Sequence, residues 1–169
     1  VEIPAPVSGP TVVDEGSAAY AETGNGWSTV PYQFAGGGAA RCHAVDTSGA
    51  TAARTFEGLD TSKYYQVLVT WAASTSNAND ASYSIAQTDA NSNVSTVTTT
   101  LNQQKYPTDV FQDNISWSIL GQCTGKTKLV VTLGTNGSDT SKRVMADAIR
   151  VVEIPAPVSG PTVVDEGSA

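Results

Sequence analysis

The chain begins and ends with the same eighteen residues. The sequence VEIPAPVSGPTVVDEGSA occupies positions 1–18 and returns without a change at positions 152–169. Such a match does not arise by chance, and self-similarity at a fixed spacing is the signature of repeat proteins. The offset between Val1 and Val152 sets a period of 151 residues. We therefore interpret the chain as one full period of a tandem array plus the start of the next, and we expect the natural molecule to be longer.

Three prolines lie within the first ten residues of each copy of the repeated segment. Proline fixes φ and pushes the preceding residue toward an extended conformation, so residues 1–10 should form a stiff spacer. We expect one domain over residues 11–152, and residues 153–169 should hold the next spacer and the first strand of the next repeat. The residues of this predicted inter-repeat link are Pro4, Pro6, Pro10, Pro155, Pro157, Pro161, Val163 and Val164.

The charge of the chain excludes one class of partner. Only 15% of the residues are charged, and 16 acidic against 9 basic side chains leave a net charge of −7. A nucleic-acid-binding domain needs a basic surface, so we expect no nucleic acid partner. The sequence also lacks an apolar stretch of the roughly 18 residues that a membrane-spanning helix requires. One period is long enough to bury a core of its own.

Short runs rich in Val, Thr, Tyr and Ile fill the chain between the two spacers, and clusters of Gly, Asn, Asp and Ser separate them. Many short strands at close spacing indicate an antiparallel sandwich or barrel. The predicted strands are Thr11–Val13, Ala39–Val45, Thr51–Glu57, Tyr64–Ala73, Ala81–Thr88, Val94–Leu101, Ile115–Leu120, Lys128–Leu133 and Val144–Val152.

Alternation of apolar and polar residues assigns faces to two of these strands. The run that starts at Tyr64 is predicted to be a central strand with one buried face. Residues 94–101 show no clear face, which predicts an edge or outer strand. The residues predicted to point inward are Tyr65, Val67, Val69 and Trp71 in the first run, and Ile115, Trp117 and Ile119 in the run that starts at Ile115.

Several of these runs resemble a known family. The residues that carry the resemblance include Gly26-Trp27-Ser28, the run 65–71, Trp117 with Leu120-Gly121, the run 130–133 and the closing Ala-Asp-Ala-Ile-Arg-Val block at 146–151. Over roughly residues 11–152 the chain resembles the golvesin C-terminal-like domain, also called the xanthan-lyase carbohydrate-binding-domain-like family. The resemblance implies an all-β, jelly-roll antiparallel β-sandwich, one domain per tandem repeat, on a secreted bacterial protein. It implies an accessory module without catalysis, and it makes sugar binding a candidate activity.

The two cysteines, Cys42 and Cys123, are an even number in an otherwise thiol-free chain. We predict a disulfide between them, with two unrelated buried thiols as the alternative. A disulfide would place the protein in an oxidising compartment outside the cytoplasm. Closing a loop of about 80 residues would stabilise the fold by roughly 4 kcal/mol in the chain-entropy model.

Asp147 has the strand parity of Met145 and Ile149, so it is predicted to point inward. A buried carboxylate must be hydrogen-bonded, paired or metal-bound. We predict a structural carboxylate that bridges to backbone N–H groups or to the opening strand. The alternative is a calcium site with carboxylates such as Asp14 and Glu15, because calcium prefers oxygen ligands. No other cofactor is indicated.

The single histidine, His43, limits the catalytic options. A Ser-His-Asp or Cys-His site would have to use it, and a zinc site needs three or four good ligands. We interpret His43 as a structural residue of its strand, and we do not expect an enzyme.

Tyr32 and Tyr106 lie in Gly- or Pro-containing loops and are predicted to be exposed. They could stack on sugar rings or contact a neighbouring repeat, whereas Trp71 and Trp117 are expected in the core. Our first hypothesis is a structural repeat subunit of an extracellular bacterial filament or giant surface protein, with adjacent copies as partners. The alternative is a repeated carbohydrate-binding, adhesive module with polysaccharide as its partner.

Overall fold

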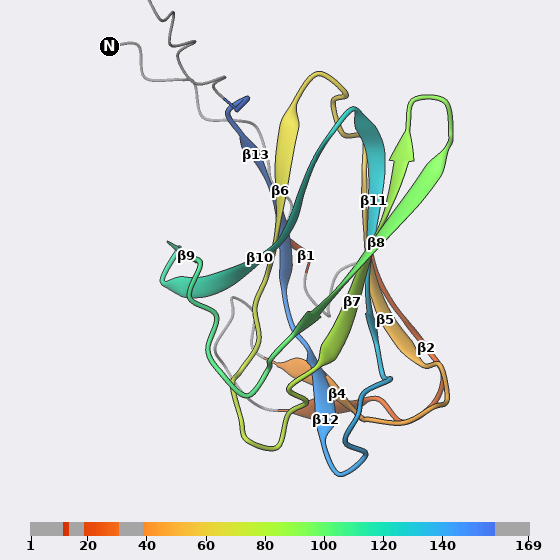
Figure 1. The fold of residues 1–169 in the computed structure, drawn as a ribbon, viewed down its shortest axis with the longest axis vertical. Helices are drawn as coiled ribbons and strands as arrows, with labels where there is room; N and C mark the ends of the chain where they lie inside the picture. Colours follow the sequence, from red (N-terminus) through yellow and green to blue (C-terminus); the bar gives the residue numbers. More distant parts are fainter. Residues whose placement is uncertain (1–11, 14–18, 31–38, 158–169) are drawn as a thin grey trace, which may run out of the picture.

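The structure, a computed structural model, describes residues 12–13, 19–30 and 39–157. Within these ranges every regular element is a β-strand, and the strands form two five-stranded sheets and one three-stranded sheet. The two larger sheets face each other across the core, and the smaller sheet lies at one end of them (Figure 1). The predicted all-β, jelly-roll antiparallel sandwich is confirmed.

The three sheets have a simple strand order. The first is β1 (Val12–Val13), β13 (Ile149–Ile154), β6 (Tyr64–Val69), β10 (Ile115–Thr124) and β9 (Val110–Gln112). The second is β2 (Tyr20–Thr23), β5 (Thr51–Glu57), β11 (Lys126–Gly134), β7 (Ala81–Asp89) and β8 (Val94–Leu101). The third is β12 (Arg143–Ala146), β4 (Ala40–Ala44) and β3 (Ser28–Val30).

Strand composition identified most of these elements correctly. β6 is central, between β13 and β10, as its alternation predicted. β8 is the predicted edge strand, and its Val94 and Val97 are 63% and 53% exposed. Strands β2, β3 and β9 lie outside the predicted set. They have 4, 3 and 3 residues, too few to show an alternating pattern.

The last predicted strand, Val144–Val152, is two strands in different sheets. β12 stops at Ala146, and the chain then passes into the first sheet, where β13 starts at Ile149. Between them the Thr70 amide donates a hydrogen bond to the Ala148 carbonyl at 3.2 Å. This crossing explains why one continuous apolar run in the sequence serves two sheets.

β13 continues past the domain boundary predicted at residue 152 and ends at Ile154. Glu153 forms an ion pair with Lys63 at 3.0 Å, which ties this end of the strand to the start of β6. The sheet therefore includes the first three residues of the second copy of the repeated segment, and the predicted spacer would start at Pro155. Residues 155–157 are exposed and belong to no strand.

The main core fills the space between the two large sheets. Alternate residues of β11 show the pattern most clearly: Leu129, Val131 and Leu133 are at most 1% exposed, while Val130 and Thr132 are half-buried. Each buried side chain of this size stabilises the fold by about 1.5–3 kcal/mol relative to an exposed position.

The first sheet carries a second, smaller apolar cluster on its other face. Leu68, Trp117 and Ala148 are buried there. The single buried face predicted for β6 is therefore wrong. The inward set predicted for β10 is also wrong, because Ser118 lies opposite Val69 of the main core and Ile119 is 37% exposed.

Arg150 closes this smaller cluster. Its guanidinium carbon lies 4.8 Å from the centre of the Trp117 ring, an attractive cation–π geometry. The same side chain forms an ion pair with Asp113 at 2.7 Å. Periodicity shows which residues share a face, but it does not show which face belongs to the larger core, and this is why Trp117 was assigned to the wrong side.

A buried amide, Gln103, joins three separate parts of the fold. Its Nε2 donates to the Tyr83 hydroxyl and to the Met145 carbonyl, both at 2.8 Å, and its Oε1 accepts from the Met145 amide at 2.8 Å. The Gln103 carbonyl accepts from Asn77 Nδ2 at 3.0 Å. Gln103 and Asn77 are both 0% exposed, so these bonds satisfy groups that water cannot reach.

We expect Gln103→Ala to be strongly destabilising. The substitution leaves both backbone groups of Met145 without their partner in a dry site, which should lower the free energy of unfolding by about 3 kcal/mol and the melting temperature by roughly 10 °C. Thermal unfolding followed by circular dichroism measures the change. The exposed Thr108→Ala, on the same loop, is the matched control, and equal melting temperatures for the two variants would contradict the assigned role.

Candidate functional site

A hollow of about 120 Å³ opens beside the β9–β10 hairpin. Its lining side chains are all uncharged: Thr70, Trp71, Tyr106, Pro107, Asn114, Ile115 and Ser116. Tyr106 is 65% exposed at its edge. The hollow is smaller than the roughly 300–1,000 Å³ pockets that enclose drug-sized ligands, so it can hold one small group of a ligand that lies across the surface.

Buried side chains fix the walls of this hollow. Trp71 Nε1 donates to the Lys105 carbonyl at 2.8 Å, directly before Tyr106 in the chain. Thr70 Oγ1 donates to the Ser116 carbonyl at 2.9 Å. Because both donors are at most 5% exposed, they act as supports, and Trp71 is a core residue as predicted.

A tight turn presents a second aromatic ring next to the hollow. Asp113 and Asn114 have φ values of 53° and 63° and connect the paired residues Gln112 and Ile115. Positive φ at both central residues is the pattern of a type I′ hairpin, which Asn and Asp tolerate. The Asp-Asn pair was the signal in the sequence that could have revealed β9.

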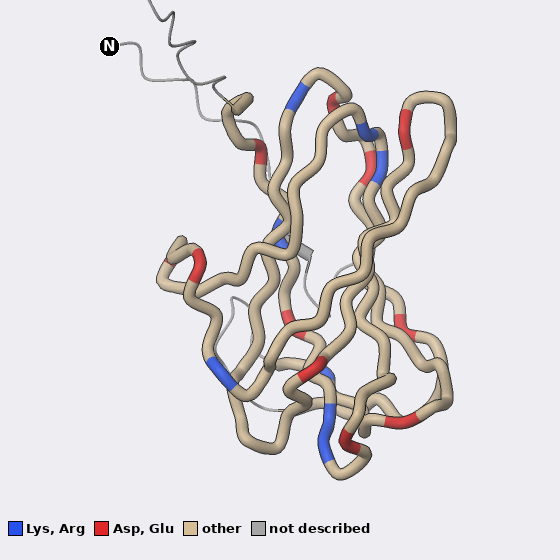
Figure 2. The backbone as a smooth tube through the Cα atoms, viewed as in Figure 1, with Lys and Arg blue, Asp and Glu red and all other residues tan. Residues whose placement is uncertain are grey.

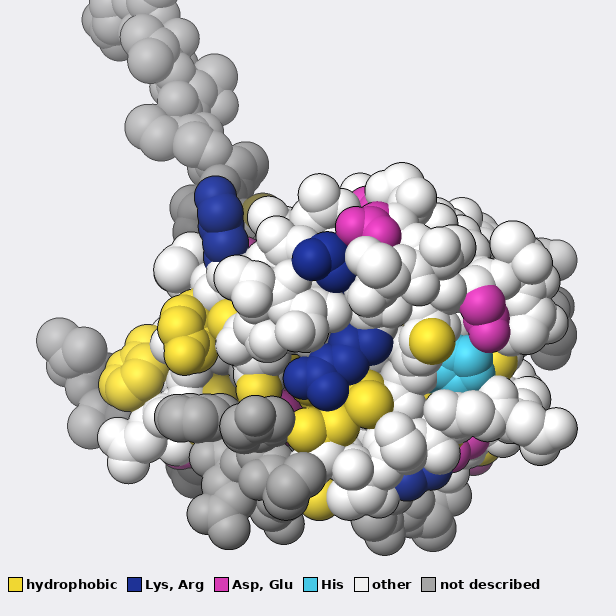
Figure 3. Space-filling view, turned by 90° about the horizontal axis from the view of Figure 1, so that it is seen from below, with side chains coloured by type: hydrophobic (Ala, Val, Ile, Leu, Met, Phe, Trp, Pro, Cys, Tyr) yellow, Lys and Arg dark blue, Asp and Glu magenta, His cyan; other side chains and the backbone are white. Residues whose placement is uncertain are grey.

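Phe111 is the ring that this hairpin presents. It lies opposite Ser116 in the strand register, so the two side chains share a face, and Phe111 is 70% exposed. Hydrophobic side chains stand out on the β9 side of the end view in Figure 3. Two exposed rings flanked by Asn and Ser side chains can bind a ligand that has both apolar C–H faces and hydroxyl groups.

The backbone positions of basic and acidic residues are intermixed in Figure 2, and neither sign gathers in one part of the described fold. Lysine, arginine, aspartate and glutamate are dispersed over the strands and turns. The neutral lining of the hollow favours a neutral ligand over an ionic one. In the described residues there is also no helix long and apolar enough to cross a membrane.

The predicted disulfide between Cys42 and Cys123 is wrong, because both thiols are free. Cys42 lies in β4 of the small sheet, where its Sγ is 3.3 Å from Ser28 Oγ. Cys123 lies beside the β10–β11 turn, at the other end of the sandwich (Figure 1). A disulfide needs Cα atoms within about 7 Å. Burial raises the pKa of the Cys123 thiol.

Asp147 is buried at 5% exposure, as its parity predicted. Its Oδ1 accepts a hydrogen bond from the Ala148 amide at 2.9 Å, and its carbonyl accepts one from the buried Arg54 guanidinium. Asp14 and Glu15 lie outside the described residues, so the calcium alternative stays a prediction. Within the described ranges, no group of three or more His, Cys, Asp or Glu side chains could hold a metal ion.

Of the remaining predicted site residues, some are described in the structure and others lie outside the described ranges. Tyr106 is exposed and borders the hollow, and Pro155 and Pro157 are exposed beyond β13. The residues that lie outside the described ranges are Tyr32, Pro4, Pro6, Pro10, Pro161, Val163 and Val164.

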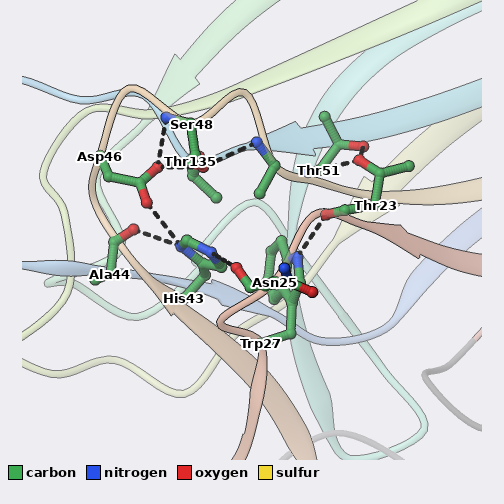
Figure 4. Close-up of polar contacts among 10 residues, drawn as sticks. Thr23, Asn25, Trp27, His43, Ala44, Asp46, Ser48, Thr51 and Thr135 are labelled. Carbon is green, nitrogen blue, oxygen red and sulfur yellow. Dashed lines mark hydrogen bonds and ion pairs between the residues drawn. The ribbon is translucent and has the colours of Figure 1, made fainter.

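His43 is part of a structural cluster at the end of the sandwich (Figure 4). Its Nδ1 lies 2.6 Å from the Ala44 carbonyl oxygen and its Nε2 lies 2.7 Å from the Asn25 carbonyl oxygen. A carbonyl only accepts, so both ring nitrogens must donate, and only the protonated imidazole can do so. Asp46 Oδ2, at 3.8 Å from Nδ1, adds a favourable charge.

Two residues next to the Asn25 turn, Gly26 and Trp27, let the imidazole of His43 approach this turn closely. The Trp27 ring lies 5.1 Å from it, centre to centre. Gly26 has a φ of 106°, and a Cβ at this position would lie 2.8 Å from His43 Nε2. Only glycine adopts this backbone without strain and leaves room for the ring.

The pKa of His43 is raised above its ordinary value of 6.5. Burial acts against the charged form, but the two carbonyl hydrogen bonds and the nearby Asp46 and Glu22 outweigh it. Because both nitrogens are engaged with backbone oxygens, the ring is a bridge between the end of β4 and the Asn25 turn. It is not arranged to activate a nucleophile, which would need one nitrogen free to accept a proton.

No protein-family model matches the sequence, and no curated protein is significantly similar to it. Among solved structures, a xanthan lyase from Paenibacillus is 24% identical with a TM-score of 0.61, over 86% of this chain and 13% of the lyase. The match thus spans a small part of the enzyme, and it shows the fold that the two proteins share.

Two carbohydrate-binding modules are more distant in structure. The C-terminal family 22 module of Clostridium thermocellum Xyn10B is 13% identical with a TM-score of 0.49, over 85% of this chain and 92% of the module. The CBM22-1 xylan-binding domain of Paenibacillus barcinonensis Xyn10C is 12% identical with a TM-score of 0.43, over 82% and 88%.

The raised pKa of His43 gives the stability a testable pH dependence. A group with a raised pKa contributes stability that is fully present below its unfolded value, about 6.5, and is lost as the pH rises through the folded value. We therefore expect the free energy of unfolding to fall above pH 6.5. Urea unfolding of the natural chain and of His43→Gln between pH 5 and 9 isolates this contribution. A constant difference between the two proteins over that range would show that folding does not shift the pKa of His43, and a difference that grows with pH would show that the fold holds the ring neutral.

Proposed function

We propose that this chain is a non-catalytic carbohydrate-binding module of a secreted bacterial protein, repeated in tandem. The observation that carries the proposal is an uncharged hollow lined in part by Asn114 and Ser116, with the exposed Tyr106 ring at its edge. A second exposed ring, Phe111, lies opposite Ser116 in the β9–β10 hairpin. The C–H face of a sugar ring packs on an aromatic ring, and its hydroxyls can pair with amide and hydroxyl groups. The expected ligand is a neutral polysaccharide.

The size of the site fits a repeated module. A hollow for one sugar unit supports weak binding by a single domain. Linked copies raise the overall affinity through effective concentration, provided that the polymer can engage several domains at once. A tandem array with the predicted period of 151 residues would supply such copies.

Membership of the golvesin-like family and an extracellular location belong to the same proposal. They are supported by the Ala-Asp-Ala-Ile-Arg-Val block, since it forms the end of β12, the buried Asp147 and the start of β13. The extracellular location does not rest on a disulfide, because both thiols are free.

Carbohydrate binding can be tested with a glycan array followed by titration of the best neutral polysaccharide. Tyr106→Ala and Phe111→Ala should each weaken binding about tenfold, the equivalent of 1.4 kcal/mol. Both residues are largely exposed, so the melting temperature should stay unchanged. Val97→Ala removes a 53% exposed side chain on the other sheet and should bind like the natural chain. An affinity that stays unchanged in both aromatic variants would show that the ligand does not bind at Tyr106 and Phe111.

A structural repeat subunit of an extracellular filament or giant surface protein is the second candidate. The identical eighteen-residue segments favour it, and so does the strand topology. β1 runs antiparallel to β13, so the chain enters the domain at the same end at which it leaves. Both connections of a domain to its neighbours would then leave from the same end. The opposite end, which carries β4 and β12, would point away from these connections (Figure 1).

Electron microscopy of a chain with several repeats tests this second function. We expect a filament whose axial repeat matches one domain plus one spacer, with domains attached by one end. Isolated beads at irregular spacing would show that the repeats are tethered but do not assemble.

A further inference from the structure

Among the described residues, only a short strand lies beside β13 on its outer side. On one side β13 pairs with β6 over all six of its residues. On the other side, the described residues provide partners only for Ile149 and Arg150, which lie opposite Val13 and Val12. Within the described residues β1, a strand of 2 residues, holds this position at the edge of a five-stranded sheet.

The occupant of this position is present twice in the chain. Val163 and Val164 repeat Val12 and Val13, and all their neighbours from Val152 to Ala169 are repeated as well. The two segments thus have the same intrinsic affinity for the edge of β13, and only the way each is connected to β13 can distinguish them.

The connection favours the second copy. If Val163 took the place of Val12 opposite Arg150, the same antiparallel register would set Ser159 opposite Ile154 and leave residues 155–158 to turn the chain. A loop of this length is common in hairpins, and it costs less closure entropy than bringing in a segment from the far end of the sequence. Pro161 would lie in an edge strand, where a missing N–H group is tolerated.

We propose that the position beside β13 binds the opening strand of the following repeat, so that neighbouring domains of the array share a sheet. The occupant is the Val163–Val164 segment, which takes the place of Val12–Val13 as the edge strand of the sheet. Each domain would then pair its β13 with the opening strand of the following repeat, so that identical strands are exchanged between neighbouring domains. The proposal goes beyond carbohydrate binding and does not depend on it.

Paired proline substitutions in the 169-residue chain test the proposal, because proline removes the N–H group that a ladder needs. One variant carries Val12→Pro and Val13→Pro, a second carries Val163→Pro and Val164→Pro, and a third carries all four. If either segment can fill the position, the first variant should lose no more than about 2 °C of melting temperature, and the four substitutions together should lose about 5 °C or more.

The pattern of losses decides the result. A small loss from the first pair with a large loss from all four supports the proposal, and so does a large loss from the second pair alone. A full loss from the first pair alone, with no effect of the second pair, overturns it, and so does the absence of any loss from all four substitutions.

A register-specific cross-link gives an independent reading. In a Cys123→Ser background, Arg150→Cys combined with Val163→Cys should form an intramolecular disulfide under mild oxidation, because directly opposed strand residues meet the Cα distance that a disulfide needs. Arg150→Cys combined with Val164→Cys is the matched control, displaced by one residue and facing the other way. Equal cross-linking in the two pairs would reflect simple proximity and would overturn the proposal.

Discussion

The arrangement of the sandwich depends on one buried amide. Gln103 lies in the loop after β8, and its two hydrogen bonds to Met145 at 2.8 Å reproduce the pairing that another strand would give to that backbone. This matters because β12 ends one residue after Met145, at Ala146, and the chain then crosses to the first sheet. The third bond, to the Tyr83 hydroxyl at 2.8 Å, fixes the same side chain against β7. A buried network whose members are satisfied defines one arrangement, since each alternative leaves polar groups unpaired.

The candidate site depends in turn on the second apolar cluster. Trp117 and Leu68 are 0% exposed on the outer face of the first sheet, and Arg150 packs over the Trp117 ring while it pairs with Asp113 in the β9–β10 turn. The hairpin is therefore held on its inner side by apolar burial and at its tip by an ion pair. This support lets Phe111 remain 70% exposed on a short edge strand. An aromatic side chain on a supported hairpin loses little entropy on binding a ligand, which favours recognition by a small site.

Much of the fold could be predicted from the sequence, because long runs such as Thr51–Glu57 and Ala81–Thr88 carry both β composition and flanking turn residues. The failures have physical causes. β9 has 3 residues and could be found only through its Asp-Asn turn. Trp117 was assigned to the main core because alternation cannot distinguish two buried faces of one strand. The cysteines were paired by counting, whereas the topology holds them in separate sheets. Tyr106 was found because a proline next to it indicated a loop, but Phe111 gave no comparable signal.

The repeated segment acquires a different meaning in the structure. Its first three residues, Val152, Glu153 and Ile154, are strand residues of β13, and the exposed Pro155 follows them. In its second copy the segment thus supplies the end of β13, and in its first copy Val12 and Val13 form β1. Because β1 and β13 are antiparallel neighbours, these two strands meet at one edge of one sheet. In the predicted tandem array the segment would therefore have to keep its two strand portions matched to each other, which a spacer alone would not require.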